Sequence, residues 1–127
     1  MRHCLVAGIG CRKGCPAEDI LMAVRYASGE THRRVDCLAA PEFKAGESGI
    51  LAAAELLSLP LVLIDALALS AVQDGCVTRS LQTLQAVGFA SVAEACALGA
   101  AGTGARLVLP RITFGAATCA LAESVVR

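Results

Sequence analysis

Residues 3–29 read HCLVAGIGCRKGCPAEDILMAVRYASG, and this stretch decides the fold. The apolar run 3–9 predicts a buried strand, and the glycine-rich segment 10–15 predicts a loop after it. Beyond the loop, apolar side chains recur at the spacing of one helix face, with Pro16 expected at the first helical position and Gly29 as the C-terminal cap. A strand, a loop and a helix in this order predict the opening unit of an α/β domain.

The same alternation continues along the chain. Further helices are expected at 48–58, 65–72, 79–87 and 92–98, and further strands at 35–40, 60–64, 106–110 and 112–122. The strand at 60–64 is apolar throughout and is expected to be buried, and the last two strands are expected to form a hairpin that turns near 114–116. We therefore predict a single α/β domain over residues 1–127, with a mixed, mostly parallel sheet, flanking helices and a C-terminal antiparallel hairpin.

Composition excludes several classes of protein. The 127 residues are 56% hydrophobic with a mean hydropathy of +0.65, which excludes an intrinsically disordered chain. Eleven basic residues balance eleven acidic ones and aromatic residues make up only 3%, so a nucleic-acid partner is not expected. The apolar stretch 50–72 has the length of a membrane span, but Glu55, Pro60 and Asp65 interrupt it, and no membrane association is expected.

The seven cysteines are an odd number and cannot all pair within one chain. Those in apolar runs, expected to be buried, are Cys4, Cys37, Cys96 and Cys119. The short apolar start does not predict a signal peptide, so we expect reduced thiols in a cytoplasmic protein. The closest spacing, Cys11 to Cys15, has no second pair to complete a zinc site, and neither a metal nor a nucleotide cofactor is expected.

The glycine-rich loop is the first candidate site, because ligands of open α/β sheets bind beyond the carboxyl ends of the strands. Gly8-Ile9-Gly10-Cys11-Arg12-Lys13-Gly14 is similar to a dinucleotide fingerprint whose third glycine comes one residue late. Two cations before a helix start instead predict a phosphate or carboxylate site, and the alternative is a plain tight turn with solvated side chains. Cys15 lies beside the same helix start, in surroundings that lower a thiol pKa, although no histidine or acid is visibly paired with it.

The second candidate site is the segment from Lys44 to Gly49. Lys44 and Glu47 could together orient a carboxylate and a water molecule. The alternative is an ordinary helix start at which Glu47 complements the helix dipole and Ser48 is the cap. Further along, the spacing of Ser91 and Glu94 predicts a capping box.

Four groups of residues together resemble one known family. They are Gly8–Gly14 with Ala17-Glu18-Asp19-Ile20; Lys44-Ala45-Gly46-Glu47-Ser48-Gly49-Ile50-Leu51; Gly88 with Ser91–Ala95 and Leu98; and Leu109-Pro110-Arg111 with Thr118-Cys119-Ala120. In this order and spacing they resemble the cobalamin-biosynthesis family comprising CobE and the C-terminal domain of CbiG, over essentially the whole chain. The resemblance implies an α/β domain that acts on corrin precursors in the cytoplasm.

The family implies a substrate class and also sets limits. CbiG-type proteins open the lactone ring of cobalt-precorrin-5A and release acetaldehyde, and they carry an additional N-terminal domain that these 127 residues do not contain. Arg111 stands where the family usually has lysine, and Cys15 stands where relatives often have threonine or serine. CobE belongs to the oxygen-dependent route, in which the lactone chemistry differs.

Three hypotheses follow from the resemblance. The first is a protein that binds a precorrin-type tetrapyrrole around the ring-contraction stage, with carboxylates held by cations and with glycines at 8, 10, 46 and 49 allowing close approach. Its expected substrate-binding residues are Gly8, Gly10, Cys11, Arg12, Lys13, Gly14, Gly46, Ser48, Gly49, Ser91, Glu94, Arg111 and Thr118. The second is a hydrolase of a δ-lactone, with Glu47 as the base and Lys44 or Lys13 stabilising the developing oxyanion. The third is a non-catalytic partner of a pathway methyltransferase that docks through the helices at 48–58 and 92–98, although these helices are expected to belong mainly to the core.

Overall fold

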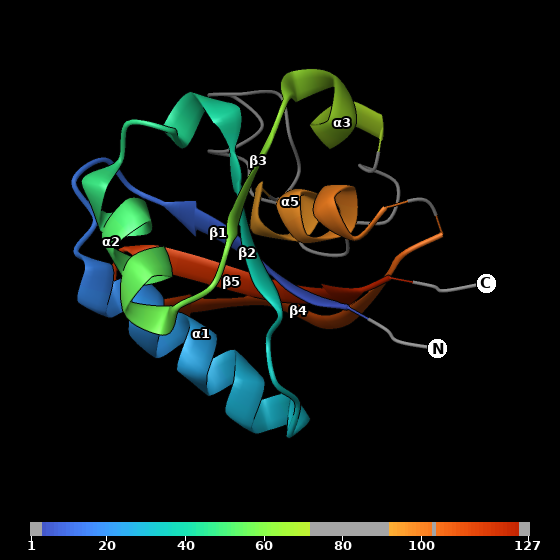
Figure 1. Ribbon diagram of the computed structural model, residues 1–127, viewed down its shortest axis with the longest axis horizontal. Coiled ribbons are helices and arrows are strands. Elements are labelled where there is room, and N and C mark those ends of the chain that lie inside the picture. The colour runs from blue at the N-terminus through green and yellow to red at the C-terminus, as the bar shows by residue number, and fades with distance from the viewer. Residues whose placement is uncertain (1–3, 72–91, 103, 125–127) are drawn as a thin grey trace.

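A five-stranded sheet is the centre of the computed structural model, which describes residues 4–71, 92–102 and 104–124. The strands lie in the order β3-β2-β1-β5-β4 (Figure 1), with bounds β1 Leu5–Cys11, β2 Cys37–Pro41, β3 Leu61–Ile64, β4 Arg106–Phe114 and β5 Ala117–Glu123. β1, β2 and β3 pair in parallel, whereas β5 is antiparallel to both β1 and β4. Among these strands only β5 runs against the others, and the expected mixed, mostly parallel sheet with a C-terminal hairpin is confirmed.

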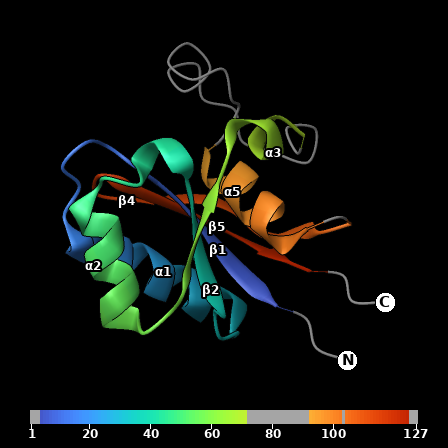
Figure 2. The same ribbon diagram turned by 45° about the horizontal axis from the view of Figure 1, so that its top comes forward.

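Helices cover both faces of the sheet (Figure 2). α1 (Ala17–Thr31) and α2 (Ser48–Leu57) pack together on one face, and α3 (Ala66–Ala71) and α5 (Val92–Ala101) pack on the other. A short 3-10 helix, η1 (Glu42–Lys44), connects β2 towards α2. The three-layer arrangement leaves the loops between strands and helices at the edges of the sheet, where they are free to carry function.

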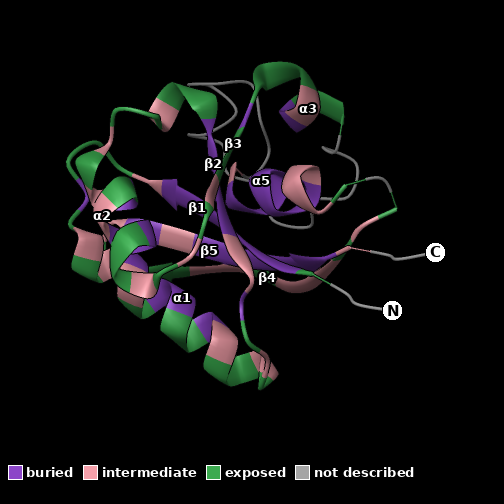
Figure 3. Ribbon diagram, viewed as in Figure 1, coloured by how far each residue is buried: buried purple, intermediate pink, exposed green. Residues whose placement is uncertain are grey.

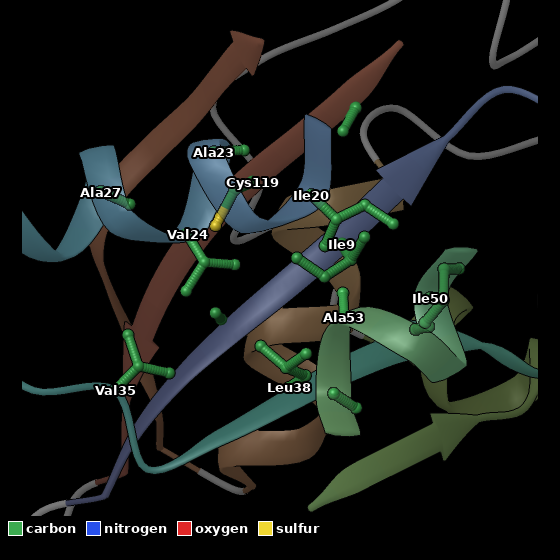
Figure 4. Packing of buried hydrophobic residues seen from close by; sticks show 14 of the residues in the cluster. Ile9, Ile20, Ala23, Val24, Ala27, Val35, Leu38, Ile50, Ala53 and Cys119 are labelled. Atoms are coloured by element: carbon green, nitrogen blue, oxygen red, sulfur yellow. The ribbon is translucent and has the colours of Figure 1, made fainter. Parts of the chain in front are cut away.

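Alternation along β1 divides the core into two layers. Leu5, Ala7 and Ile9 point towards α1 and α2, where they meet residues such as Ile20 and Ile50 (Figure 4). Val6 points to the opposite face and belongs to the cluster under α3 and α5. All of β1 except its last residue is buried (Figure 3), because the strand is covered on both faces and paired along both edges.

α5 lies directly on β1 because both elements have small residues at the contact. A Cβ atom at Gly8 would lie 2.0 Å from the Ala93 carbonyl oxygen and 2.5 Å from the Ala97 nitrogen. Every residue from Ala93 to Leu98 is buried, so this part of the helix belongs to the core and offers no face to a partner. The expectation that the helix at 92–98 belongs mainly to the core is therefore confirmed for residues 93–98.

Several sequence expectations need correction. β3 is an edge strand, not a buried one, and Val62 and Leu63 are 39% and 42% exposed. α1 continues through Gly29, and the left-handed cap residue is His32, with φ 53°. Pro16 precedes the first helical residue instead of occupying that position.

The C-terminal elements also differ from the expectation in their lengths. α5 extends beyond residue 98 to Ala101, and β4 is one strand that passes through Pro110 with a shifted register between Leu109 and Ile112. The hairpin turns where expected, with Gly115 at φ 59°. The helix expected at 79–87 lies outside the described residues.

Glu123 joins two segments at the end of the sheet where β1 begins. Its buried carboxylate accepts a hydrogen bond from Arg33 at 2.6 Å and another from Arg106 of β4. These two hydrogen bonds hold the pKa of the Glu123 carboxyl below its ordinary value, and the bond from Arg33 has the larger effect. The charged form of Glu123 is therefore favoured by folding.

Gly8→Ala tests the contact between β1 and α5. The new methyl group meets backbone atoms that cannot rotate away, so the free energy of unfolding should fall by about 2 kcal/mol or more. Gly46→Ala is the matched control, because no described atom lies within 4 Å of its Cβ position, and the change should stay within about 0.5 kcal/mol. Urea denaturation measures both, and equal stability of the two variants would contradict the packing.

Glu123→Gln tests the ion pairs through pH. Because the folded-state pKa is lowered, their stabilisation is complete above the unfolded pKa of about 4.3 and is lost as the pH falls through the folded value. The variant should denature at lower urea than the wild type at pH 7, and the difference should shrink below pH ~4. Glu55→Gln, on an exposed position of α2, is the control. A difference between wild type and Glu123→Gln that does not change with pH would contradict this role.

Candidate functional site

The loop after β1 is a tight turn that exposes two cations. The Cys15 N–H donates to the Arg12 carbonyl oxygen at 3.0 Å, and Gly14 has the positive φ, 76°, that such a turn requires. Arg12 and Lys13 are exposed, and α1 begins directly after Pro16. The turn expected from the sequence is therefore present, and it carries positive charge at a helix N-terminus.

The start of α2 is fixed to this loop. Both Glu47 carboxylate oxygens accept from the Gly14 N–H, at 3.1 and 3.3 Å. Gly49 lies so close to the loop that a Cβ atom there would be 2.1 Å from the Cys15 carbonyl oxygen. Two segments more than thirty residues apart in sequence thus form one surface at the carboxyl end of β1 (Figure 1).

Lys44 and Glu47 both act on the Cys11 thiol. The pKa of Cys11 is raised mainly because the thiol is partly buried; the charge of Lys44 opposes the shift and the charge of Glu47 adds to it. Lys44 is half-buried, whereas Gly46 between the two is exposed. The Glu47 N–H donates to the Lys44 carbonyl oxygen at 3.0 Å, so the two residues proposed for catalysis, Lys44 and Glu47, lie together beside the end of β1.

Cys15 differs from the sequence expectation. It was expected in surroundings that lower a thiol pKa, but the structure buries it to 5% exposure beneath the contact with Gly49. Burial raises the pKa of Cys15 to about 11, and the nearby Cys11 and Asp19 add to the shift. The expectation of a lowered pKa is wrong because loss of solvent outweighs the helix N-terminus and the neighbouring cations.

The other cysteines in the described part of the chain are partly as expected. Cys96 and Cys119 are fully buried, and burial raises the pKa of Cys119 to about 12. Cys37 is half-buried, and Cys4 is exposed rather than buried because it precedes β1.

Asp19 ties the β4–β5 hairpin to the same edge. Its carboxylate accepts from the Ala116 N–H at 3.0 Å, and a Cβ atom at Gly115 would lie 2.4 Å from one of its oxygens. The Arg12 N–H also donates to the Ala116 carbonyl oxygen at 3.0 Å. Sequence reasoning placed Asp19 only in the first turn of a helix. Its link to a hairpin about a hundred residues later had no local signal.

The side chain of Glu94 binds the backbone of Arg111. Glu94 is fully buried on α5, and its carboxylate accepts from the Arg111 N–H at 2.9 Å, where the register of β4 is irregular. The Arg111 side chain belongs to a half-buried residue two strands from β1, and none of the described contacts joins it to the Arg12 loop. Glu94 has an internal role here, and its expected capping partner Ser91 lies outside the described residues.

Most of the glycines that were expected to leave room for a ligand are in contact with other parts of the chain. The space beside Gly8 holds α5, the space beside Gly49 holds the Cys15 carbonyl, and the space beside Gly10 holds the Thr118 hydroxyl, which donates to the Gly10 carbonyl oxygen at 3.3 Å. Gly46 remains open. Among the substrate-binding residues proposed from sequence, Gly8, Gly10, Gly49 and Thr118 therefore have a structural explanation.

The helix caps are also distributed differently from the expectation. Ser48 was expected to cap α2, but it is the first helical residue and is exposed. The N-cap residue of α2 is Glu47, whose side chain makes no capping hydrogen bond within the described part of the chain. Glu47 uses its carboxylate on Gly14 instead. Asp65 does cap α3 as expected, since it accepts from the Ala68 N–H at 2.8 Å.

Across 4–71, 92–102 and 104–124, no group of three or more His, Cys, Asp or Glu residues is placed to hold a metal ion. None of the helices in these ranges combines the length and the apolar character needed to cross a bilayer.

Comparison with known proteins decides the family. The family described as "Cobalamin synthesis G C-terminus" matches residues 5–122, from β1 to β5. The chain belongs to this family. It is a cobalamin-biosynthesis protein of the CobE/CbiG type, which confirms the resemblance seen in the four sequence groups.

Relatives agree in sequence and in fold. CobE of Sinorhizobium sp is 33% identical over 121 residues, which cover 93% of this chain and 79% of CobE. The crystal structure of a CobE from the cobalamin (vitamin B12) biosynthetic pathway superposes with a TM-score of 0.91 at 33% identity, covering 100% of this chain and 94% of the other. The cobalamin biosynthesis protein chiG of Agrobacterium tumefaciens superposes with a TM-score of 0.79 at 43% identity, covering 96% of this chain and 99% of the other.

Proposed function

We propose that this CobE/CbiG-family chain binds a precorrin-type tetrapyrrole, around the ring-contraction stage of cobalamin biosynthesis, at the carboxyl end of β1 and β2. The observation that carries the proposal is the contact between the two glycine-containing loops. The Gly14 amide holds the Glu47 carboxylate, so the start of α2 and the cationic turn before α1 form one rigid surface. Such preorganisation lowers the entropic cost of binding a large ligand.

Charge on this surface suits an acid-fringed macrocycle. Precorrins carry several carboxylates around an apolar ring, and charge-assisted hydrogen bonds to carboxylate are the strong kind. Arg12 and Lys13 are exposed on the turn, and Lys44 lies on the neighbouring loop. The amides at the starts of α1 and α2 add positive partial charge on the same side.

Apolar side chains near the cations suit the ring itself. Phe43 of η1 is 54% exposed and Leu51 of α2 is 51% exposed, on the same segment as Lys44 and Gly46. An exposed aromatic next to an open glycine offers a flat apolar contact to a macrocycle. This segment supplies the apolar floor that the proposed ligand requires.

A tetrapyrrole titration tests binding. Lactone-stage precorrin added to the purified chain should change its absorbance spectrum with saturation, and the double variant Arg12→Gln/Lys13→Gln should weaken binding at least ~10-fold, as expected for charge-assisted hydrogen bonds. Arg25→Gln removes a cation from an exposed position two turns into α1 and is the matched control. No saturable change at high ligand concentration would contradict the proposal, as would equal losses in the double variant and the control.

A second candidate function is opening of the δ-lactone of a (cobalt-)precorrin-5A-like intermediate with release of acetaldehyde. It is favoured by the proximity of Lys44 and Glu47, which are joined by a hydrogen bond from the Glu47 N–H to the Lys44 carbonyl oxygen at 3.0 Å. In this mechanism Glu47 accepts a proton from the water that attacks the lactone carbonyl carbon, and Lys44 stabilises the carbonyl oxygen as it gains negative charge. The C–O bond of the ring then breaks. Glu47 would leave the Gly14 amide, which becomes available to a substrate carboxylate.

Glu47→Gln separates the two candidates. The glutamine amide oxygen still accepts from the Gly14 N–H, so the loop contact is kept while the base is removed. If the chain is a hydrolase, acetaldehyde release should fall by at least ~100-fold, in line with loss of a general base, while the spectral change on binding persists. Unchanged acetaldehyde release by the variant would exclude Glu47 as the base. A spectral change without acetaldehyde in the wild type would leave binding as the function.

A further inference from the structure

We propose that Cys11 and Cys15 are a thiol pair that a low-molecular-weight disulfide converts into an intramolecular disulfide. Cys11 lies at the end of β1, beside the ligand surface proposed above, but the modification does not depend on ligand binding. It uses Cys15, for which the sequence showed no paired histidine or acid. The disulfide would join the end of β1 to the start of α1.

The turn brings the two thiols together. The hydrogen bond from the Cys15 N–H to the Arg12 carbonyl, at 3.0 Å, folds the chain back over Gly14, so that Cys15 returns to the end of β1. Both side chains pack in the same core cluster, Cys15 within it and Cys11 against it, and the Cys15 thiol donates to the Pro16 carbonyl oxygen at 3.5 Å. Gly49 packs against the Cys15 carbonyl and holds this side of the turn in place.

The surroundings of the two sulfurs assign different roles to them. Cys11 is half-buried and Cys15 is buried, so Cys11 is the sulfur that an external disulfide can reach. The positive charge of Lys44 and the hydrogen bond from Cys15 both favour the Cys11 thiolate, although burial and Glu47 keep its pKa above the ordinary value. Cys15 needs no solvent access for the second step, because its target is then Cys11.

The chemistry is two successive thiol–disulfide exchanges. The Cys11 thiolate attacks one sulfur of oxidised glutathione, forms a mixed disulfide and releases one glutathione thiolate. The Cys15 thiolate then attacks the Cys11 sulfur, forms the internal disulfide and releases the second glutathione thiolate. The two protons lost by the protein thiols go to the two leaving thiolates, and glutathione disulfide is the electron acceptor.

Other described cysteines are less suited to the reaction. Cys96 and Cys119 are fully buried, in different core clusters. Cys4 and Cys37 are close enough for their charges to interact, since Cys4 contributes to raising the pKa of Cys37. They are the competing pair that the experiment must separate from Cys11 and Cys15.

The experiment incubates the reduced chain of 127 residues with oxidised glutathione at mildly alkaline pH and follows its intact mass and free thiols. In the wild type, Cys11 and Cys15 should both lose their free thiols, together with two hydrogens, and no glutathione should be retained at either residue. Trypsin cuts after the exposed Arg12 and Lys13, between the two cysteines, so the peptides 3–12 and 14–25 should stay joined until a reductant is added.

Two variants complete the test. Cys4→Ser/Cys37→Ser removes the competing pair and should still form the internal disulfide. Cys15→Ser removes the second sulfur and should stop with one glutathione attached at Cys11. The proposal is overturned if Cys4→Ser/Cys37→Ser keeps all its thiols or retains glutathione instead of closing. It is equally overturned if peptides 3–12 and 14–25 separate without reductant.

Discussion

The contact between Gly8 of β1 and α5 is the constraint on which the rest of the structure depends. A carbonyl oxygen of the helix lies 2.0 Å from the place that a Cβ atom would take, so only glycine permits this approach. β1 is the central strand, paired with β2 on one side and β5 on the other. The distance between β1 and α5 sets the position of the helical layer on that face of the sheet. It also sets the position of Cys11, where the chain leaves the sheet.

A second close contact at a glycine joins the two loops at the carboxyl end of β1. Gly49 allows α2 to begin against the Cys15 carbonyl, and Glu47 then reaches the Gly14 amide. Glycines that suggest an open ligand site from sequence are here filled by neighbouring backbone. The ligand surface that we propose consists of the cationic turn and the exposed part of the Lys44 loop, which the Glu47–Gly14 contact joins.

Much of the fold followed from local patterns, because strands, helices and caps depend on nearby residues. The alternation of elements, the hairpin turn at Gly115 and the Asp65 cap were all predictable in this way. The position of each strand within the sheet is not local, and for that reason an apolar β3 was expected inside and lies at the edge. The prediction of a lowered pKa for Cys15 was wrong for a similar reason. The burial of this residue depends on Gly49, which is more than thirty residues away in sequence. Within the site, the sequence indicated Lys44 and Glu47 together, but it gave no sign that the Glu47 carboxylate would be bound to Gly14.

The most direct measurement of the central claim is a map of backbone amide chemical shifts during titration with a carboxylate-bearing precorrin. The account predicts that the amides of Gly14 and Gly46 shift with a common saturation curve, because both lie on the proposed surface at the carboxyl end of the parallel strands. Amides near the Arg33–Glu123 ion pair, at the other end of the sheet, should stay unchanged. Saturable shifts confined to that other end, with Gly14 and Gly46 unmoved, would contradict the account.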